Sequence, residues 1–220
     1  MSIKQTVLSS IGQKLLLATS GLIMFLLFLI PHMGGNVLFL FGPDIFNSYA
    51  HHLHQLVPIV IGIEVLMLTS ITVHMIMAFR VVLTNRAAAD KRLSQKSSEE
   101  RSLAARLMPV SGGMIFIFII KHLLDFKFYE KAQTTLHGVE TYDVYAMVLH
   151  RFQDDPVHLL FYVGFMVAVG LHLSHALQSS LQTYGLFVPR EGSKIKQVSS
   201  ILGWGMAATF SIIPVIAFIK

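Results

Sequence analysis

Four histidines lie within long apolar segments of the chain, where ionisable side chains are rare and usually functional. They are His32, His74, His122 and His172. Imidazole is a common ligand of transition metals, and it also carries protons near neutral pH. Two neutral imidazoles at one height in a helical bundle can hold the iron of a haem from both sides. The depth of each histidine therefore bears directly on what the four residues do.

The composition places these histidines in a membrane. The chain has 220 residues, of which 54% are hydrophobic and 13% charged, whereas about 25% of the residues of a soluble domain are charged. A run of about 18 or more apolar residues can cross the hydrocarbon layer as a helix. Five segments meet this length: residues 15–41, 56–83, 107–128, 157–184 and 198–219. The sequence predicts an all-α membrane protein, a single domain over residues 1–220 built as a five-helix transmembrane bundle.

The positions of Lys and Arg predict the orientation of the spans, because cytoplasmic connections are enriched in both. The first connection carries none of them, and the second carries seven: Arg80, Arg86, Lys91, Arg92, Lys96, Arg101 and Arg106. The N-terminus is therefore expected inside and the C-terminus outside. Orientation also accounts for the formal charge of +5, so no nucleic acid is expected as a partner.

Two connections are long enough to hold structure of their own. Residues 84–106 are charged and rich in alanine, so a helical extension or a mobile cytoplasmic loop is expected there. Residues 128–155, on the outer side, are expected to hold a short amphipathic helix lying at the surface.

Depth within these spans sorts the histidines into two layers. A helix rises about 1.5 Å per residue, so His32 and His122 lie near the outer face, and His74 and His172 near the inner face. Each layer takes one histidine from each of two spans. This pairing predicts two stacked bis-histidine haems b between the first four spans. Haem b needs no cysteine, and the chain has none. Histidines that are only packed, or that relay protons, remain the alternative.

Residues near the histidines are candidates for supporting roles. Pro31 and the pair Gly34–Gly35 flank His32, where they can bend the helix and let a macrocycle approach the backbone. Arg80 and Lys121 are candidate partners for haem propionates. Positive residues that anchor a span at the membrane edge would occupy the same positions.

Glu64 is an acid inside an apolar span, about 15 Å from His74 toward the outer face. A carboxyl group at that depth can exchange protons with a quinone, or it can be hydrogen-bonded inside the bundle. His51 lies at the outer mouth of the same span. Glu64 and His51 are therefore the predicted residues of a quinone and proton-transfer site.

Five motifs follow one another along nearly the whole chain: His32-Met-Gly-Gly-Asn36, Phe46-Asn47-Ser-Tyr-Ala-His51, Glu64 with His74, Phe116-Ile-Phe-Ile-Ile-Lys-His122 and His172-Leu-Ser-His-Ala-Leu-Gln-Ser-Ser-Leu-Gln-Thr183-Tyr-Gly185. In this order and spacing they resemble the cytochrome b membrane-anchor subunit of succinate dehydrogenase and fumarate reductase, in its five-helix, two-haem form. The resemblance implies that His32 and His122 are the axial ligands of the distal haem, and His74 and His172 those of the proximal haem. It favours His172 over its neighbour His175.

The resemblance also implies partners and a location. A flavoprotein subunit and an iron–sulfur subunit would dock on the basic cytoplasmic face, and the dicarboxylate would react on the flavoprotein. The chain would relay electrons through its haems between the iron–sulfur subunit and a membrane quinone, menaquinone rather than ubiquinone. It would lie among the lipids of a bacterial cytoplasmic (inner) membrane, where the complex can form a higher oligomer.

Two other functions fit part of the pattern. The cytochrome b subunit of a membrane hydrogenase or formate dehydrogenase also holds two haems in a small bundle. A cofactor-free transporter could use the intramembrane histidines and Glu64 as a proton relay. The motif that begins at His172 and the pair Phe46-Asn47 favour the anchor subunit. A succinate:quinone or fumarate:quinone oxidoreductase is therefore the predicted function.

Overall fold

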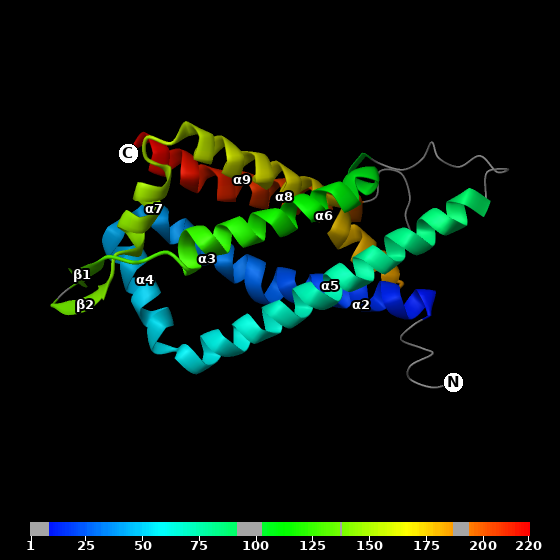
Figure 1. The fold of residues 1–220 in the computed structure, drawn as a ribbon, viewed down its shortest axis with the longest axis horizontal. Coiled ribbons are helices and arrows are strands. Elements are labelled where there is room, and N and C mark those ends of the chain that lie inside the picture. Colours follow the sequence, from blue (N-terminus) through cyan, green and yellow to red (C-terminus); the bar gives the residue numbers. More distant parts are fainter. Residues whose placement is uncertain (1–8, 92–102, 137, 187–193) are drawn as a thin grey trace.

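Five helical segments dominate the structure. The computed structural model describes residues 9–91, 103–136, 138–186 and 194–220. Within them, the segments long and apolar enough to cross a membrane are Ser10–Phe41, Val57–Asn85, Ala105–Lys127, Pro156–Thr183 and Lys194–Ile219. Each overlaps a predicted span, and the ends differ by a few residues. The protein is thus a mostly helical, multi-pass membrane protein, as the apolar segments predict (Figure 1).

The first span changes its helical form near Pro31. It consists of α2 (Ser10–Met24), the π-helical turn η1 (Phe25–Leu29), α3 (Ile30–Val37) and the 3₁₀ turn η2 (Leu38–Phe41). Proline has no amide hydrogen, so Pro31 cannot make the regular bond to the carbonyl four residues earlier. The preceding turn is wider instead, and the Ile30 amide donates to the Phe25 carbonyl.

The fourth span is the central helix of the bundle. The remaining spans are α5 (Val57–Lys91), α6 (Leu103–His122) with the π-helical turn η3 (Leu123–Lys127), α8 (Pro156–Thr183) and α9 (Lys194–Ile219). α8 packs along α9, α6 and α2, whereas α5 packs along α2. Of the 18 most apolar consecutive residues of α8, 39% are buried, compared with 6% of the corresponding stretches of α5 and α6. α5 and α6 therefore present most of their apolar surface outward.

Glycines allow α8 and α9 to approach each other closely. A Cβ atom on Gly203 of α9 would lie 2.5 Å from the Ser174 backbone nitrogen of α8. A Cβ atom on Gly170 of α8 would lie 2.7 Å from Cε3 of Trp204. Any larger residue at these two positions would push the helices apart.

Shorter elements gather at one end of the bundle, which we call the hairpin end (Figure 1). They are α4 (Pro43–Gln55), the antiparallel strands β1 (Gln133–Leu136) and β2 (Val139–Tyr142), and α7 (Val144–Phe152). The opposite end carries Lys14, Arg80 and Arg106, and we call it the basic end. The sequence did not predict α4 or the hairpin.

The surface helix predicted for residues 128–155 is wrong in its position. A helix, α7, does form there, but Tyr145, Met147, Val148 and Phe152 are buried. Asn47 of α4 holds it in place, because Nδ2 of Asn47 donates to Asp143 Oδ1 at 3.0 Å and the Tyr145 amide donates to Asn47 Oδ1 at 2.9 Å. α7 therefore belongs to the core of the hairpin end.

The helical extension predicted for residues 84–106 is present in part. α5 continues to Lys91, and α6 begins at Leu103. Residues 92–102 lie outside the described residues, and they include Arg92, Lys96 and Arg101 of the predicted docking surface.

Candidate functional site: two histidine pairs

The four histidines within the spans come together as two pairs. His32 of α3 faces His122 at the end of α6, with ring centroids 5.8 Å apart and ring planes at 87°. His74 of α5 faces His172 of α8, with centroids 6.4 Å apart and planes at 62°. We call these the hairpin-end pair and the basic-end pair. They are the same two pairs that the depth estimate predicts.

The spacing of each pair suits two imidazoles on one metal ion. A metal–imidazole bond is about 2 Å long, and the centre of a five-membered ring with bonds of about 1.33 Å lies about 1.1 Å from each atom. Two imidazoles on opposite sides of one iron therefore have centroids about 6.2 Å apart. An edge-to-face pair of packed rings covers the same range of distances. The hydrogen bonds of the ring nitrogens must therefore be considered too.

In the basic-end pair, each ring is held through Nδ1 by a neighbouring helix. Nδ1 of His74 lies 3.1 Å from the Leu17 carbonyl and 3.3 Å from Ser20 Oγ, both on α2. Nδ1 of His172 lies 3.3 Å from Ser111 Oγ on α6. When Nδ1 donates its hydrogen, Nε2 keeps the lone pair that a metal binds. This is the arrangement that ligating histidines generally have.

The surroundings of His172 repeat those of His74. His172 also bonds the Met108 carbonyl, so in each half a carbonyl is followed three residues later by the bonded serine. A glycine comes directly after each serine, and the ring lies against it. A Cβ atom on Gly21 would lie 3.1 Å from His74 Cε1, and one on Gly112 would lie 3.3 Å from His172 Cε1. α2 and α6 thus present the same Ser-Gly step to the rings.

Ser20 and Ser111 were missed, although the sequence holds a signal for them. Ser20 lies six residues after Lys14, and Ser111 lies five residues after Arg106. Both depths are about 8–9 Å from the basic end, which is the depth of His74. A search for hydroxyl groups at the level of each histidine layer would have found them.

The hairpin-end pair has different partners. Nδ2 of Asn36 lies 3.3 Å from His32 Nε2 and donates to the His32 carbonyl at 2.8 Å. Nδ1 of His122 is buried and has no hydrogen-bond partner in the part of the chain that the structure describes. Leaving a buried polar atom unsatisfied costs about 1–3 kcal/mol. His122 thus lacks the hydrogen bond at Nδ1 that both rings of the basic-end pair have.

Aromatic rings and wide helical turns surround the hairpin-end pair. Phe28 stacks on His32 with centroids 5.0 Å apart, and Phe126 lies 5.0 Å from His122. η1 ends three residues before His32, and η3 begins directly after His122. Single π-helical turns are frequent at functional sites, because they re-aim the side chains that follow.

The two pairs lie at separate levels of the bundle. Gly112, at the basic-end pair, precedes His122 by ten residues of α6, which is about 15 Å along the helix. Gly21 precedes His32 by eleven residues, which is about 16 Å. The agreement between two independent spans supports two stacked sites rather than one shared cluster.

The residues that flank His32 differ in their surroundings. A Cβ atom on Gly35 would lie 2.6 Å from Cε1 of Tyr49, so this glycine makes room for α4. Gly34 has open space, with nothing within 4 Å of an added Cβ atom. Pro31 does alter the helix, as predicted, through the wide turn η1 that precedes it.

The predicted quinone residues have partners of their own. Glu64 forms an ion pair with Lys127, and its side chain is 48% exposed. Nδ1 of His51 lies 3.2 Å from Thr141 Oγ1, and its Nε2 lies 2.9 Å from Gln55 Nε2. Glu64 therefore carries a compensated charge on the outward surface of α5, and His51 connects α4 to β2.

The two predicted propionate partners differ in their surroundings. Lys121 donates to both carboxylate oxygens of Asp125, so an acid of the chain already matches its charge. Arg80 lies exposed on α5 at the basic end. His175 lies beside the basic-end pair, where its Nδ1 is 3.3 Å from Gln178 Nε2.

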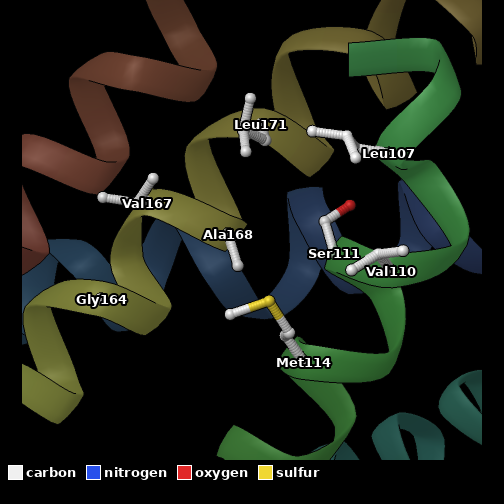
Figure 2. A pocket seen from close by; sticks show the side chains of 8 residues that line it. All are labelled: Leu107, Val110, Ser111, Met114, Gly164, Val167, Ala168 and Leu171. Carbon is white, nitrogen blue, oxygen red and sulfur yellow. The ribbon is translucent and has the colours of Figure 1, made fainter. Parts of the chain in front are cut away.

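A small apolar pocket opens between α6 and α8 near His172 (Figure 2). Its volume is about 120 Å³, and Ser111 from α6 and Ala168 from α8 both line it. Figure 2 shows the Ser111 hydroxyl among aliphatic side chains and Met114. The other side chains that line the pocket are apolar, so the pocket could take a small apolar group.

Comparisons with known proteins do not identify the chain. Comparison with models of protein families, with curated proteins and with solved structures gives no match. Within the described residues, no three His, Asp or Glu side chains are grouped so that they could hold a metal ion. Coordination by two histidines and a macrocycle is the metal chemistry that the two pairs fit.

Proposed function

We propose that the protein is the di-haem cytochrome b membrane anchor of a succinate:quinone or fumarate:quinone oxidoreductase. The observation that carries the proposal is the basic-end pair. Its two imidazoles face each other at 6.4 Å between centroids, and each ring is fixed through Nδ1 by a serine on the neighbouring helix. Packed histidines would also need partners for Nδ1, so the support lies in the two rings being held in the same way, as two ligands of one iron would be.

The four histidines would hold two haems b. His74 and His172 would be the axial ligands of the proximal haem, and His32 and His122 those of the distal haem. A haem that is bound in this way accepts one electron at a time and passes it on. The chain places the two levels about 15 Å apart, and the apolar helices exclude water from both.

The residues that contact the histidines would set the orientation of the imidazole rings. The hydrogen bonds that Nδ1 of each ring donates to the Leu17 and Met108 carbonyls and to the Ser20 and Ser111 hydroxyls would fix the tautomer of the proximal ligands and raise the basicity of the coordinating nitrogen. The unpartnered Nδ1 of His122 leaves the distal site with weaker support of this kind.

The ends of the bundle would face different partners. The basic end would lie on the cytoplasmic side, where the flavoprotein and iron–sulfur subunits dock, since cytoplasmic connections carry Lys and Arg. The hairpin end would lie on the outer side of a bacterial cytoplasmic membrane. A quinone, menaquinone rather than ubiquinone, would react at that end with electrons that have passed through the chain.

Purification from native membranes tests the proposal. A pyridine haemochrome assay should give two haems b per chain, flavin should co-purify, and succinate should reduce the haems. A colourless, folded protein would refute every cytochrome function. Two haems without flavin, and without reduction by succinate, would instead favour the cytochrome of a hydrogenase or formate dehydrogenase.

A further inference from the structure

A buried carboxylate lies at the hairpin end, near the end of the third span. Asp125 of η3 has a side chain that is 4% exposed. It accepts hydrogen bonds from Lys121 Nζ and from the Tyr162 hydroxyl, the latter at 2.7 Å. Arg151 Nη2 of α7 lies 3.2 Å from its Oδ1. Lys121 lies four residues before Asp125, a spacing at which opposite charges meet on a helix.

His158 connects this carboxylate to the surface of the protein. Its Nε2 lies 3.3 Å from Asp125 Oδ2, and this atom is buried without a hydrogen-bond partner among the described residues. A small rotation of the ring would complete the bond. The His158 backbone amide donates to Asp155 Oδ1 at 2.9 Å. A pocket of about 280 Å³ opens on this side, lined by Lys121, Asp155, Val157, His158 and Phe161.

Tyr162 connects the carboxylate to the hairpin-end pair. Its ring centroid lies 4.8 Å from that of His158 and 6.2 Å from that of His122. Polar groups therefore follow one another from the pocket through His158 and Asp125 to the level of the distal pair. The surroundings are otherwise aromatic, and they include Phe118 and Phe126 against Tyr162.

An ion-pair cluster alone would not require this arrangement. Lys121 and Arg151 suffice to compensate the charge of Asp125 and to tie α6 to α7. They do not explain why His158 lies 3.3 Å from the same carboxylate at the edge of a pocket. Ionisable groups at membrane depth are costly and usually functional, and a carboxylate beside an imidazole is a common proton-transfer pair.

We propose that Asp125 and His158 carry protons between the water at the hairpin end and a quinone that reacts beside the hairpin-end pair. This inference rests on the proposed function. Reduction of a quinone to a quinol takes up two electrons and two protons, and oxidation of succinate to fumarate supplies the two electrons. Each proton passes from water to His158, then to Asp125, and from there to a quinone oxygen. Oxidation of a quinol returns both protons by the same route, while Tyr162 keeps its own proton and orients Asp125.

The charged groups around the path are known from the structure. Lys121 on α6 and Arg151 on α7 face Asp125, and Asp155 at the start of α8 faces the pocket beside His158. Glu64 lies elsewhere, on α5, in its ion pair with Lys127. The path therefore has a buried acid in its middle and a solvent-exposed acid at its rim.

The test uses the complex that contains this chain, purified from native membranes with Asp125→Asn or His158→Phe. The Phe ring retains the packing of His158 against Phe152 and Tyr162. Reoxidation of the reduced haems by a soluble naphthoquinone is followed by stopped flow over the pH range in which histidine titrates. Asp154→Asn is the matched control, because Asp154 is an exposed acid with a φ of 59° that asparagine tolerates.

We expect Asp125→Asn to slow reoxidation about a hundredfold and His158→Phe to flatten its pH dependence. Haem content and reduction of the haems by succinate should stay normal. Unchanged rates and pH profiles in both variants would overturn the proton path while leaving the proposed function intact. If Asp125→Asn loses haem, His158→Phe decides by its pH profile. A fall in rate with Glu64→Gln but not with His158→Phe would assign the path to α5 instead. A wild-type complex without haem would refute the proposed function itself.

Discussion

Replacing Gly112 by leucine should remove one haem and leave the other. Gly112 lies on α6 against the His172 ring, and an added Cβ atom would already be 3.3 Å from His172 Cε1. Alanine at this position requires the ring to move by only a few tenths of an ångström. Leucine adds three further carbon atoms in the same direction. The ring must then leave its place between Ser111 and His74.

The magnitude follows from the cost of overpacking, which is about 1–3 kcal/mol for extra methylene groups in a filled interior. Expressed as haem affinity, this is a loss of about 5- to 150-fold at the proximal site. The distal site, about 15 Å further along α6, should be unaffected. Gly112→Ala should keep both haems but alter the spectrum of the proximal one.

Gly113 provides the matched control, because a Cβ atom there would have nothing within 4 Å. Gly113→Leu should therefore retain two haems. The assay is a pyridine haemochrome titration per chain, combined with electron paramagnetic resonance to identify which ferric haem is missing. Retention of both haems by Gly112→Leu, with loss of one by Gly113→Leu, would refute the placement of His172 as a ligand.

Three further predictions test the surrounding structure. Ser20→Ala and Ser111→Ala should each keep both haems and raise the reduction potential of the proximal haem alone, because each removes a hydrogen bond that makes the ligand more basic. A potentiometric titration measures this potential, with Ser211→Ala as the control. A shift in the potential of the distal haem would count against the prediction. Gly203→Leu should lower the free energy of unfolding by about 2–3 kcal/mol, since its Cβ atom meets the Ser174 backbone, whereas Gly205→Leu should change the thermal melting temperature little. Asn47→Ala should cost about 2 kcal/mol, because it leaves the buried Tyr145 amide without its partner and removes one of the two hydrogen bonds that Asp143 Oδ1 accepts. Hydrogen exchange of α7 should then be about 30-fold faster. Unchanged protection would contradict the role of Asn47.

The spans and the pairing of the histidines were predictable, because both depend on position along a helix. Lys14, Arg80 and Arg106 mark the basic end, and counting residues from them gives the depth of each histidine. Depth is a single coordinate, so the assignment of each histidine to a layer does not change when a predicted helix end is wrong by a few residues. It does not predict which ring nitrogen is bonded or by what.

Tertiary partners were not predictable in the same way. Asp125 is close to the end of its span, and only the structure brings Arg151 and Tyr162 to it from elements far along the chain. Glu64 is tolerated in an apolar segment because Lys127 reaches it from the end of the third span. Apolar periodicity contains no information about such distant partners.

The hairpin end shows a second limit. α7 has an amphipathic pattern that fits a membrane surface as well as a protein core, and the choice depends on Asn47, about a hundred residues earlier. The π-helical turns beside His32 and His122 are a similar case, because the residues of each turn would also fit a regular α-helix. Pro31 indicates the first turn, and no residue of the second one does.

Haem content of the single histidine variants tests the central claim most directly. The wild-type protein should hold two haems b. His74→Ala and His172→Ala should each lose the same haem, and His32→Ala and His122→Ala should each lose the other. The electron paramagnetic resonance signal of the remaining ferric haem identifies which one is lost. A wild-type protein without haem, or the loss of different haems from His74→Ala and His172→Ala, would contradict the account. Loss of a haem from His175→Ala, with both kept in His172→Ala, would contradict the assignment in α8.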